Sequence, residues 1–295
     1  MLRYLSIVKR KLKSHYGFQL LRLAAGWNRL KGVILPEETL VQIHDDERAR
    51  VLTLDHPPVN ALSRSLLKQL GEALEKTRDD NRIAVVIITG AGQNAFAAGA
   101  DIRELALIHS KDEAARLAAE GQTLFNKIEH FPKPVIAAIN AVCLGGGNEL
   151  ALACHIRIAS ERARFGQPEV NLGIIPGFGG TQRLARLVGL PRATELVLTG
   201  DIIPAKEAER IGLINRSVPD GEELKVAKGI ARKIASKGQV AVRKALQALV
   251  EGREKWLTDG LALEASLFGD TTSTDDMKEG IQAFLEKRQP QFKDR

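Results

Sequence analysis

The chain has 295 residues, of which 44% are hydrophobic and 27% are charged, so it is long enough to bury a sizeable core. No apolar run reaches the roughly 20 residues that a membrane-spanning helix needs. Two cysteines without a spaced Cys/His set argue against a disulfide framework and a structural zinc site. These features predict a soluble protein in a reducing compartment.

The net charge of +7 belongs to an N-terminal extension, residues 1–36, which holds eight Lys/Arg and no acid. Residues 37–295 are balanced, with 35 basic and 36 acidic side chains. The extension is compatible with a targeting presequence, a membrane-surface helix, a nucleic-acid arm, a poorly ordered tail or an over-extended start. We expect a bacterial cytoplasmic protein, or one of the mitochondrial matrix if residues 1–36 are a presequence.

From Leu40 onward, strand-like and helix-like segments alternate. Short apolar, β-branched runs predict strands at 49–55, 83–89, 133–140 and 156–160. Between the first two, apolar residues recur at helical spacing, at Leu66, Leu67, Leu70 and Leu74. Such alternation favours an α/β domain whose sheet is covered by helices.

From about Pro191 the pattern becomes almost wholly helical. A last amphipathic helix is predicted from about Thr274 to Lys287, with Asp275 and Asp276 in its first turn, as the helix dipole favours. We therefore divide the chain after residue 36 into a catalytic core, 37–230, and a helical C-terminal region, 231–295.

Three glycine-rich segments are candidates for parts of a functional site. The first, "TGAGQNAFAAGADI" at 89–102, superficially matches the GxGxxA motif of dinucleotide-binding proteins. That motif requires a helix to open immediately, with an acid after the next strand. Here the stretch from Phe96 to Asp101 indicates a second small-residue turn before a helix near Ile102. We therefore expect no nucleotide cofactor.

The second segment, "CLGGGNELALAC" at 143–154, places three glycines before an apolar helix. Bare glycine backbone at a helix N-terminus offers free N–H groups to negative charge, including an oxyanion. Glu149 falls in the first helical turn. It is either a simple complement to the helix dipole or a catalytic carboxylate, and the segment alone favours neither.

The third segment, "FGQPEVNLGIIPGFGGTQRL" at 165–184, adds a second carboxylate, Glu169, beside an apolar run. Such surroundings tend to raise a carboxyl pKa, which suits a proton donor or acceptor. Taken alone, an exposed loop glutamate is the simpler interpretation. Catalytic roles for the two glutamates become the better interpretation when both are considered together with the flexible, glycine-rich stretch Gly177 to Gly180.

The segments "FAAGADIREL", "LGGGNELALAC" and "FGQPEVNLGIIPGFGGTQRL" resemble the signature segments of the crotonase superfamily, specifically those of enoyl-CoA hydratases. The likeness covers about residues 50–295. It implies a crotonase-type ββα superhelix, with sheets covered by helices and a helical C-terminal part. In this family that part packs on the core and on neighbouring subunits of a homotrimer or homohexamer.

The resemblance also implies roles for individual residues. The N–H groups of Ala100 and Gly146 would hold the thioester oxygen as an oxyanion hole. Glu149 and Glu169 would act on water and on the substrate carbon, with Glu169 as the C2 acid/base. The implied substrate- and CoA-binding residues are Ala100, Asp101, Ile102, Arg103, Gly146 and Gly177, the last beside the catalytic water.

The implied reaction is the reversible hydration of trans-2-enoyl-CoA to 3-hydroxyacyl-CoA, as in fatty-acid β-oxidation. No cofactor is expected, because CoA is part of the substrate, and the histidines lack metal-ligand spacing. Family isomerases usually keep only the second carboxylate, so the presence of both favours hydration. The alternatives are another crotonase-fold lyase or isomerase, such as a methylglutaconyl-CoA-type hydratase, and RNA binding through residues 1–36, although nucleic acid is not the expected partner.

Two positions depart from the family pattern. His155 stands where an aspartate is usual, and Asn140-Ala141 replaces an Asn-Gly pair before the glycines. We interpret His155 as a packed or surface histidine rather than a catalytic base. Neither change removes a predicted oxyanion or carboxylate residue.

Overall fold

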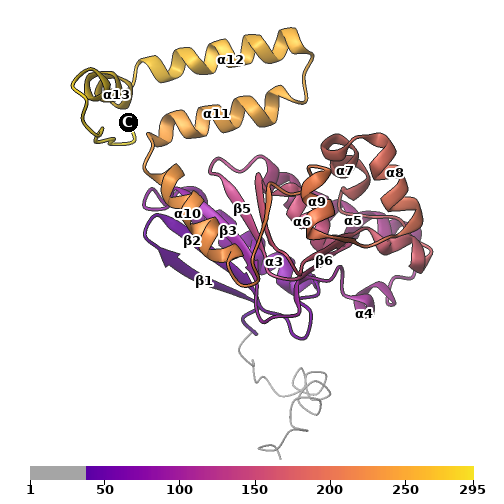
Figure 1. Ribbon diagram of the computed structural model, residues 1–295. Coiled ribbons are helices and arrows are strands. Elements are labelled where there is room, and N and C mark those ends of the chain that lie inside the picture. Colours follow the sequence, from indigo (N-terminus) through magenta and orange to yellow (C-terminus); the bar gives the residue numbers. More distant parts are fainter. Residues whose placement is uncertain (1–37) are drawn as a thin grey trace, which may run out of the picture. The chain divides into compact units, whose positions relative to one another are not determined.

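The computed structural model describes residues 38–295 (Figure 1). The interpretations of residues 1–36 lie outside the described residues and stay predictions. Among the residues described, no helix is both long and apolar enough to cross a membrane.

Two sheets form the centre of the structure. In the larger sheet β1 is antiparallel to β2 and the other neighbours are parallel, in the order β1 (Val41–Asp46), β2 (Ala49–Leu54), β3 (Val85–Gly90), β5 (Val135–Ile139), β7 (Ile156–Ser160) and β10 (Arg216–Val218). In the smaller sheet only β9 is antiparallel to its neighbour, in the order β4 (Ala95–Ala97), β6 (Val142–Leu144), β8 (Arg164–Gly166) and β9 (Ile203–Pro204).

The chain repeats one pattern three times: a strand in the larger sheet, a strand in the smaller sheet, then a helix. β3 and β4 lead to α4 (Ile102–Leu105) and α5 (Lys111–Glu129). β5 and β6 lead to α6 (Gly146–Ala153). β7 and β8 lead to the 3₁₀ helix η2 (Pro168–Leu172) and then α7 (Gly180–Val188). The predicted ββα superhelix is confirmed.

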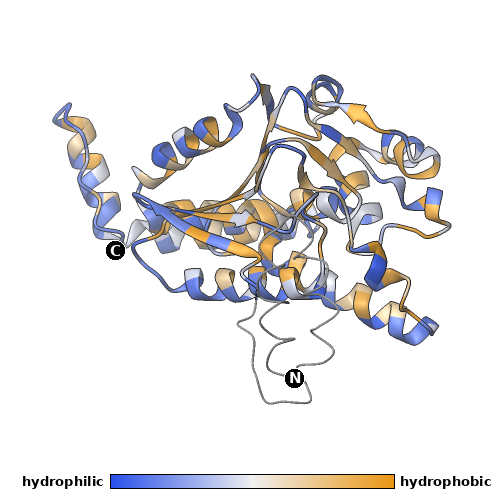
Figure 2. Cartoon of the chain, turned by 90° about the horizontal axis from the view of Figure 1, so that it is seen from below, coloured by the Kyte–Doolittle hydropathy of each residue, from blue (hydrophilic) through white to orange (hydrophobic). Residues whose placement is uncertain are grey.

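Helices cover both faces of the larger sheet, except at the edge strand β1, where most residues are exposed. Alternate side chains of each strand point to opposite sides of the sheet, so each face has its own core. One face packs on α3 (Arg64–Arg78) and the other on α10 (Glu223–Ala235). Figure 2 shows hydrophobic strands at the centre and hydrophilic residues on the helices around them. The α3 side buries Leu66, Leu70, Leu74, Val86 and Ile88, and the α10 side buries Val85, Ile87, Ala227 and Ala231.

From residue 190 onward the helices are α8 (Leu190–Thr199), α9 (Ala205–Arg210), α10, α11 (Gln239–Gly252), α12 (Leu257–Thr272) and α13 (Asp275–Leu285). The last predicted helix corresponds to α13, which is capped by Thr274. The almost wholly helical interpretation missed β9 and β10, because strands of two and three residues are too short to give a periodic signal. The division drawn at residue 230 falls inside α10, and it stays a prediction.

Candidate active site

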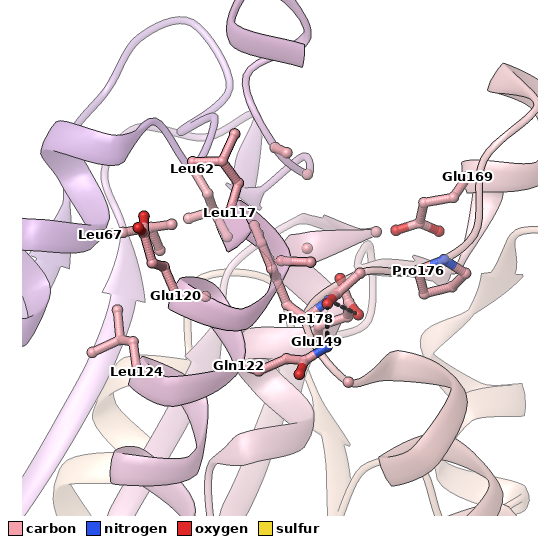
Figure 3. Close-up of a pocket in the computed structure, with 18 of the residues that line it drawn as sticks. Leu62, Leu67, Leu117, Glu120, Gln122, Leu124, Glu149, Glu169, Pro176 and Phe178 are labelled. Carbon is pink, nitrogen blue, oxygen red and sulfur yellow. Dashed lines mark hydrogen bonds between the residues drawn. The ribbon is translucent and has the colours of Figure 1, made fainter. Parts of the chain in front are cut away.

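A single cavity of about 1520 Å³ brings the three glycine-rich segments together (Figure 3). Of the residues predicted for the site, its lining includes Ala100, Asp101, Ile102, Gly146, Glu149, Glu169 and Gly177. Arg103 does not belong to the lining; its guanidinium pairs with the Asp101 carboxylate at 3.2 Å. The structure therefore assembles all of the predicted residues except Arg103 around one space.

The backbone N–H groups of Ala100 and Gly146 lie close together at this cavity. Ala100 forms a parallel bridge with Leu62, in which Leu62 N–H donates to Gly99 O at 2.8 Å and Asp101 N–H donates to Leu62 O at 3.4 Å. The N–H of Ala100 itself therefore points away from Leu62. Gly146 is the first residue of α6, so its N–H has no acceptor within the helix. A Cβ placed on Gly146 would lie 3.4 Å from Ala100 N.

The glycines at the start of α6 are required by space as well as by conformation. Gly145 has φ 52°, and a Cβ there would lie 2.7 Å from Glu169 Oε1. A Cβ on Gly147 would collide with the carbonyl oxygen of Ala97. The helix that follows is buried at every residue, so its N-terminus and Glu149 enter the core together. Close packing thus explains why this apolar segment begins with three glycines.

Glu149 is only 2% exposed, yet its carboxylate is well provided with donors. The Phe178 N–H donates to Glu149 Oε1 at 2.8 Å, and the Gly180 N–H donates to the same oxygen at 2.6 Å. Burial raises the pKa of Glu149 to about 7, although the Gly180 N–H opposes the rise. The charge of Glu169 raises this pKa further. Glu149 can therefore exchange a proton near neutral pH.

Glu169 faces the same cavity from η2, where it follows Pro168 in the first turn. Burial raises the pKa of this carboxyl too. The fully buried amide of Gln167, with its nitrogen turned toward the carboxylate, donates to both oxygens at 3.2 Å. The sequence interpretation missed Gln167, although it adjoins the Pro-Glu pair.

The loop that holds Glu149 is itself anchored by an ion-pair network at the cavity. Arg183 donates to Glu129 Oε2 at 2.8 Å and to the Phe178 carbonyl oxygen at 3.0 Å. Arg253 reaches the other Glu129 oxygen at 3.4 Å. These residues were not predicted from the sequence, because their partners lie up to 124 residues apart.

His155 lies outside the cavity lining and joins backbone groups. Its Nδ1 accepts from Val135 N–H at 2.8 Å, so its Nε2 carries the proton and donates to Glu129 O at 3.0 Å. Burial lowers its pKa. Of the two alternatives in our interpretation, a packed or a surface histidine, the structure shows the packed one.

The two cysteines also lie in the core, as free thiols, Cys143 and Cys154. Burial raises the pKa of both, that of Cys154 to about 12. Across residues 38–295 no cluster of three or more His, Cys, Asp or Glu is arranged to hold a metal ion.

Comparison with known proteins identifies the family. The model of the enoyl-CoA hydratase/isomerase family matches residues 46–295. A probable enoyl-CoA hydratase of Bacillus subtilis is 47% identical over 84% of this chain and 96% of its own length, and a crotonyl-CoA hydratase of Syntrophomonas wolfei is 47% identical over 85% and 96%. The crystal structure of an enoyl-CoA hydratase from Bacillus anthracis, 41% identical, superposes with a TM-score of 0.84 over 87% of this chain and 100% of its own. Because the family match takes in most of the sequence and the fold agrees, the chain belongs to the enoyl-CoA hydratase/isomerase family.

Proposed function

We propose that this protein catalyses the reversible hydration of trans-2-enoyl-CoA to 3-hydroxyacyl-CoA. The proposal rests above all on one observation: two carboxylates with raised pKa values and two adjacent backbone N–H groups line one cavity. The hydratase names of relatives at 47% identity support the same reaction.

The N–H groups of Ala100 and Gly146 activate the substrate. Both donate to the thioester oxygen, which draws electron density from the C2–C3 double bond and stabilises the enolate formed when hydroxide adds. Fixed donors of this kind lower the barrier strongly, and loss of one typically costs about 3 kcal/mol. Since Gly146 has no side chain, the acyl group can approach its backbone closely.

The two glutamates carry the proton transfers. Glu149 removes a proton from water as the water oxygen bonds to C3, and Glu169 delivers a proton to C2, so that H and OH add across the double bond. This step needs one ionised and one protonated carboxyl. Proximity of the two groups favours that mixed state, because ionising one raises the pKa of the other.

The cavity offers different surfaces to the two ends of the substrate. The acyl chain lies against the apolar part, which includes Leu62, Leu67, Leu117, Leu124 and Phe178 (Figure 3). Ala100, Asp101 and Ile102 line the CoA portion, and the basic side chain of Arg64 belongs to the same cavity lining. The enzyme needs no cofactor or metal in this scheme, since water and the thioester supply every reacting atom. The buried free thiols fit a cytoplasmic location.

We further propose that copies of this chain associate through the C-terminal helices as a homotrimer or a pair of trimers. α11 and α12 lie along each other as an antiparallel pair (Figure 1). On the outer side of α12, Leu257, Leu261 and Phe268 are 78%, 54% and 69% exposed. Their spacing places them on one helical face, which also carries the exposed Glu264, and large apolar side chains exposed together on one face are typical of an interaction surface.

A scan of enoyl-CoA chain lengths tests the function. Loss of the conjugated thioester absorbance is followed for the wild type, Glu149→Gln and Glu169→Gln. We expect hydration by the wild type and a loss of at least about 100-fold in kcat for each variant, since each removes a proton-transfer group. Full hydration in both variants would contradict the mechanism. Double-bond migration without hydration by the wild type would identify an isomerase instead.

A further inference from the structure

A buried glycine, Gly121, lies within the long continuous helix α5, at a position where the backbone conformation does not require glycine. Glycine in a helix interior is destabilising relative to alanine. The reason for it is steric. A Cβ on Gly121 would overlap the Phe178 ring, and it would lie 3.0 Å even from the more distant Cγ. The ring of Phe178 therefore rests directly on the α5 backbone, in a notch that only glycine leaves open.

The same ring touches two other parts of the site. Phe125, one helical turn beyond Gly121, meets it edge to face, with ring centroids 5.5 Å apart and planes at 78°. A Cβ on Gly146 would lie 3.3 Å from Phe178 Cδ2, so the ring also lies against the N-terminus of α6. Phe178 thus fills the space between α5 and the residue whose N–H faces the thioester oxygen.

The backbone of Phe178 links this packing to Glu149. Its N–H donates to Glu149 Oε1 at 2.8 Å, as described above. Beside the notch, Gln122 Nε2 donates to the Gly177 carbonyl oxygen at 2.8 Å, which fixes the preceding residue of the same loop to α5. A shift of the ring away from α5 would therefore move the N–H that holds the carboxylate.

We propose, on the basis of the proposed function, that Gly121 is a positioning residue for the reaction: its missing side chain seats the Phe178 ring on α5, and the seated loop aims the Phe178 N–H at Glu149. Gly121 itself touches no reacting atom. Its effect passes through Phe178 to the carboxylate and to the packing of Gly146.

Gly121→Ala in the full-length protein tests the proposal. We expect kcat for a short enoyl-CoA to fall about 10- to 100-fold, because misplacement of a catalytic group by about 1 Å has effects of this size. KM should change less than about three-fold if binding is largely kept. Loss of the Phe178 N–H should also raise the Glu149 pKa and move the corresponding limb of the pH profile upward. Gly229→Ala is the matched control, since Gly229 lies in α10 with nothing within 4 Å of an added Cβ.

The double variant Gly121→Ala/Phe178→Leu separates positioning from general damage. The smaller side chain leaves room for the new Cβ, so we expect kcat of the double variant to approach that of Phe178→Leu alone, which measures what loss of the ring itself costs. The proposal would be overturned if Gly121→Ala kept the wild-type kcat and pH profile. It would also be overturned if the double variant kept the loss of kcat and showed an unchanged pH profile. Should Gly121→Ala fail to fold, recovery of active enzyme in the double variant supports the contact, and failure to recover overturns it.

A measurement that needs no substrate separates the test of the positioning role from the test of the proposed function. The difference in melting temperature between Gly121→Ala and Gly121→Ala/Glu149→Gln, followed against pH, reports the Glu149 pKa in the variant. The same pair in the wild-type background gives the reference. A wild type that does not hydrate enoyl-CoA defeats the proposed function, whereas an unchanged Glu149 pKa in Gly121→Ala defeats the positioning role.

Discussion

Glu149 is a residue at which activity and stability oppose each other. Burial raises its pKa to about 7, whereas an unfolded chain ionises it near its ordinary value of 4.5. The folded state therefore binds the proton more tightly than the unfolded state. Its contribution to stability is complete below about pH 4.5 and is lost as the pH rises through 7, where a buried charge must form.

Replacing Glu149 by Gln should therefore stabilise the protein in alkaline solution. The amide oxygen can still accept from the Phe178 and Gly180 N–H groups, but it never becomes charged. At about pH 8.5 we expect a gain of roughly 3 kcal/mol in the free energy of unfolding, from 1.36 kcal/mol per unit of pKa shift, and little gain at about pH 4.5. Denaturant unfolding at several pH values measures it, with the exposed Glu161→Gln as the control. A gain that does not vary with pH would contradict this origin.

The residues of the site show which interactions a sequence reveals. Glu149 and Glu169 were predicted because the glycine-rich segments that carry them resemble the signature segments of enoyl-CoA hydratases. Their partners were not: Phe178 and Gly180 act through backbone N–H groups, which every residue except proline carries, and they lie 29 and 31 residues from Glu149. Gly121 shows the same limit, because the Phe178 ring that requires a glycine there comes 57 positions later in the sequence.

Among the elements, β3 and β5 were predicted well and β9 and β10 were missed. Fully buried strands such as β3 consist of uninterrupted β-branched or small apolar residues, a strong signal. β9 and β10 have two and three residues and exist because a longer strand beside them offers hydrogen bonds. Tertiary context of this kind leaves no periodic pattern in the sequence.

His155 joins three elements at one point. It immediately precedes β7, accepts from the first residue of β5 and donates to the last residue of α5. Because Nδ1 must be an acceptor, a proton added there would break the bond to Val135. The neutral ring is thus the form that the fold requires, which agrees with the lowered pKa.

Acid should therefore weaken this junction. The unfolded chain protonates His155 below about pH 6.5, whereas the folded protein resists it, so its contribution to stability is complete above 6.5 and declines as the pH falls. His155→Asn keeps an acceptor for Val135 but cannot take up a proton. We expect it to cost about 1 to 2 kcal/mol near pH 8, from the lost Glu129 contact, and to unfold with a flatter pH dependence between about 5 and 7. Equal pH dependence in the wild type and the variant would contradict this role.

At the scale of residues 40–295, which form one compact unit, the α11–α12 pair joins the site to the exposed apolar face of α12. Arg253, at the end of α11, lines the cavity and pairs with Glu129. Leu267 on α12 is buried, while Leu257, Leu261 and Phe268 are exposed on another side. A sequence can reveal that α12 is apolar on more than one side, but it cannot say which side faces α11.

The apolar face of α12 predicts self-association. Each exposed large side chain that becomes buried between subunits contributes about 1.5 to 3 kcal/mol, so Phe268→Asp should weaken the assembly by at least that amount. We expect sedimentation velocity to show trimers or hexamers for the wild type at micromolar concentration and mainly monomers for Phe268→Asp. Phe268→Leu, which keeps an apolar side chain, should remain assembled. A monomeric wild type, or a Phe268→Asp variant that assembles as tightly as the wild type, would show that α12 does not form the interface. Because Arg253 and Glu129 belong to one chain, we expect a folded Phe268→Asp monomer to keep that ion pair, so any accompanying loss of hydration would reflect what the neighbouring copy contributes.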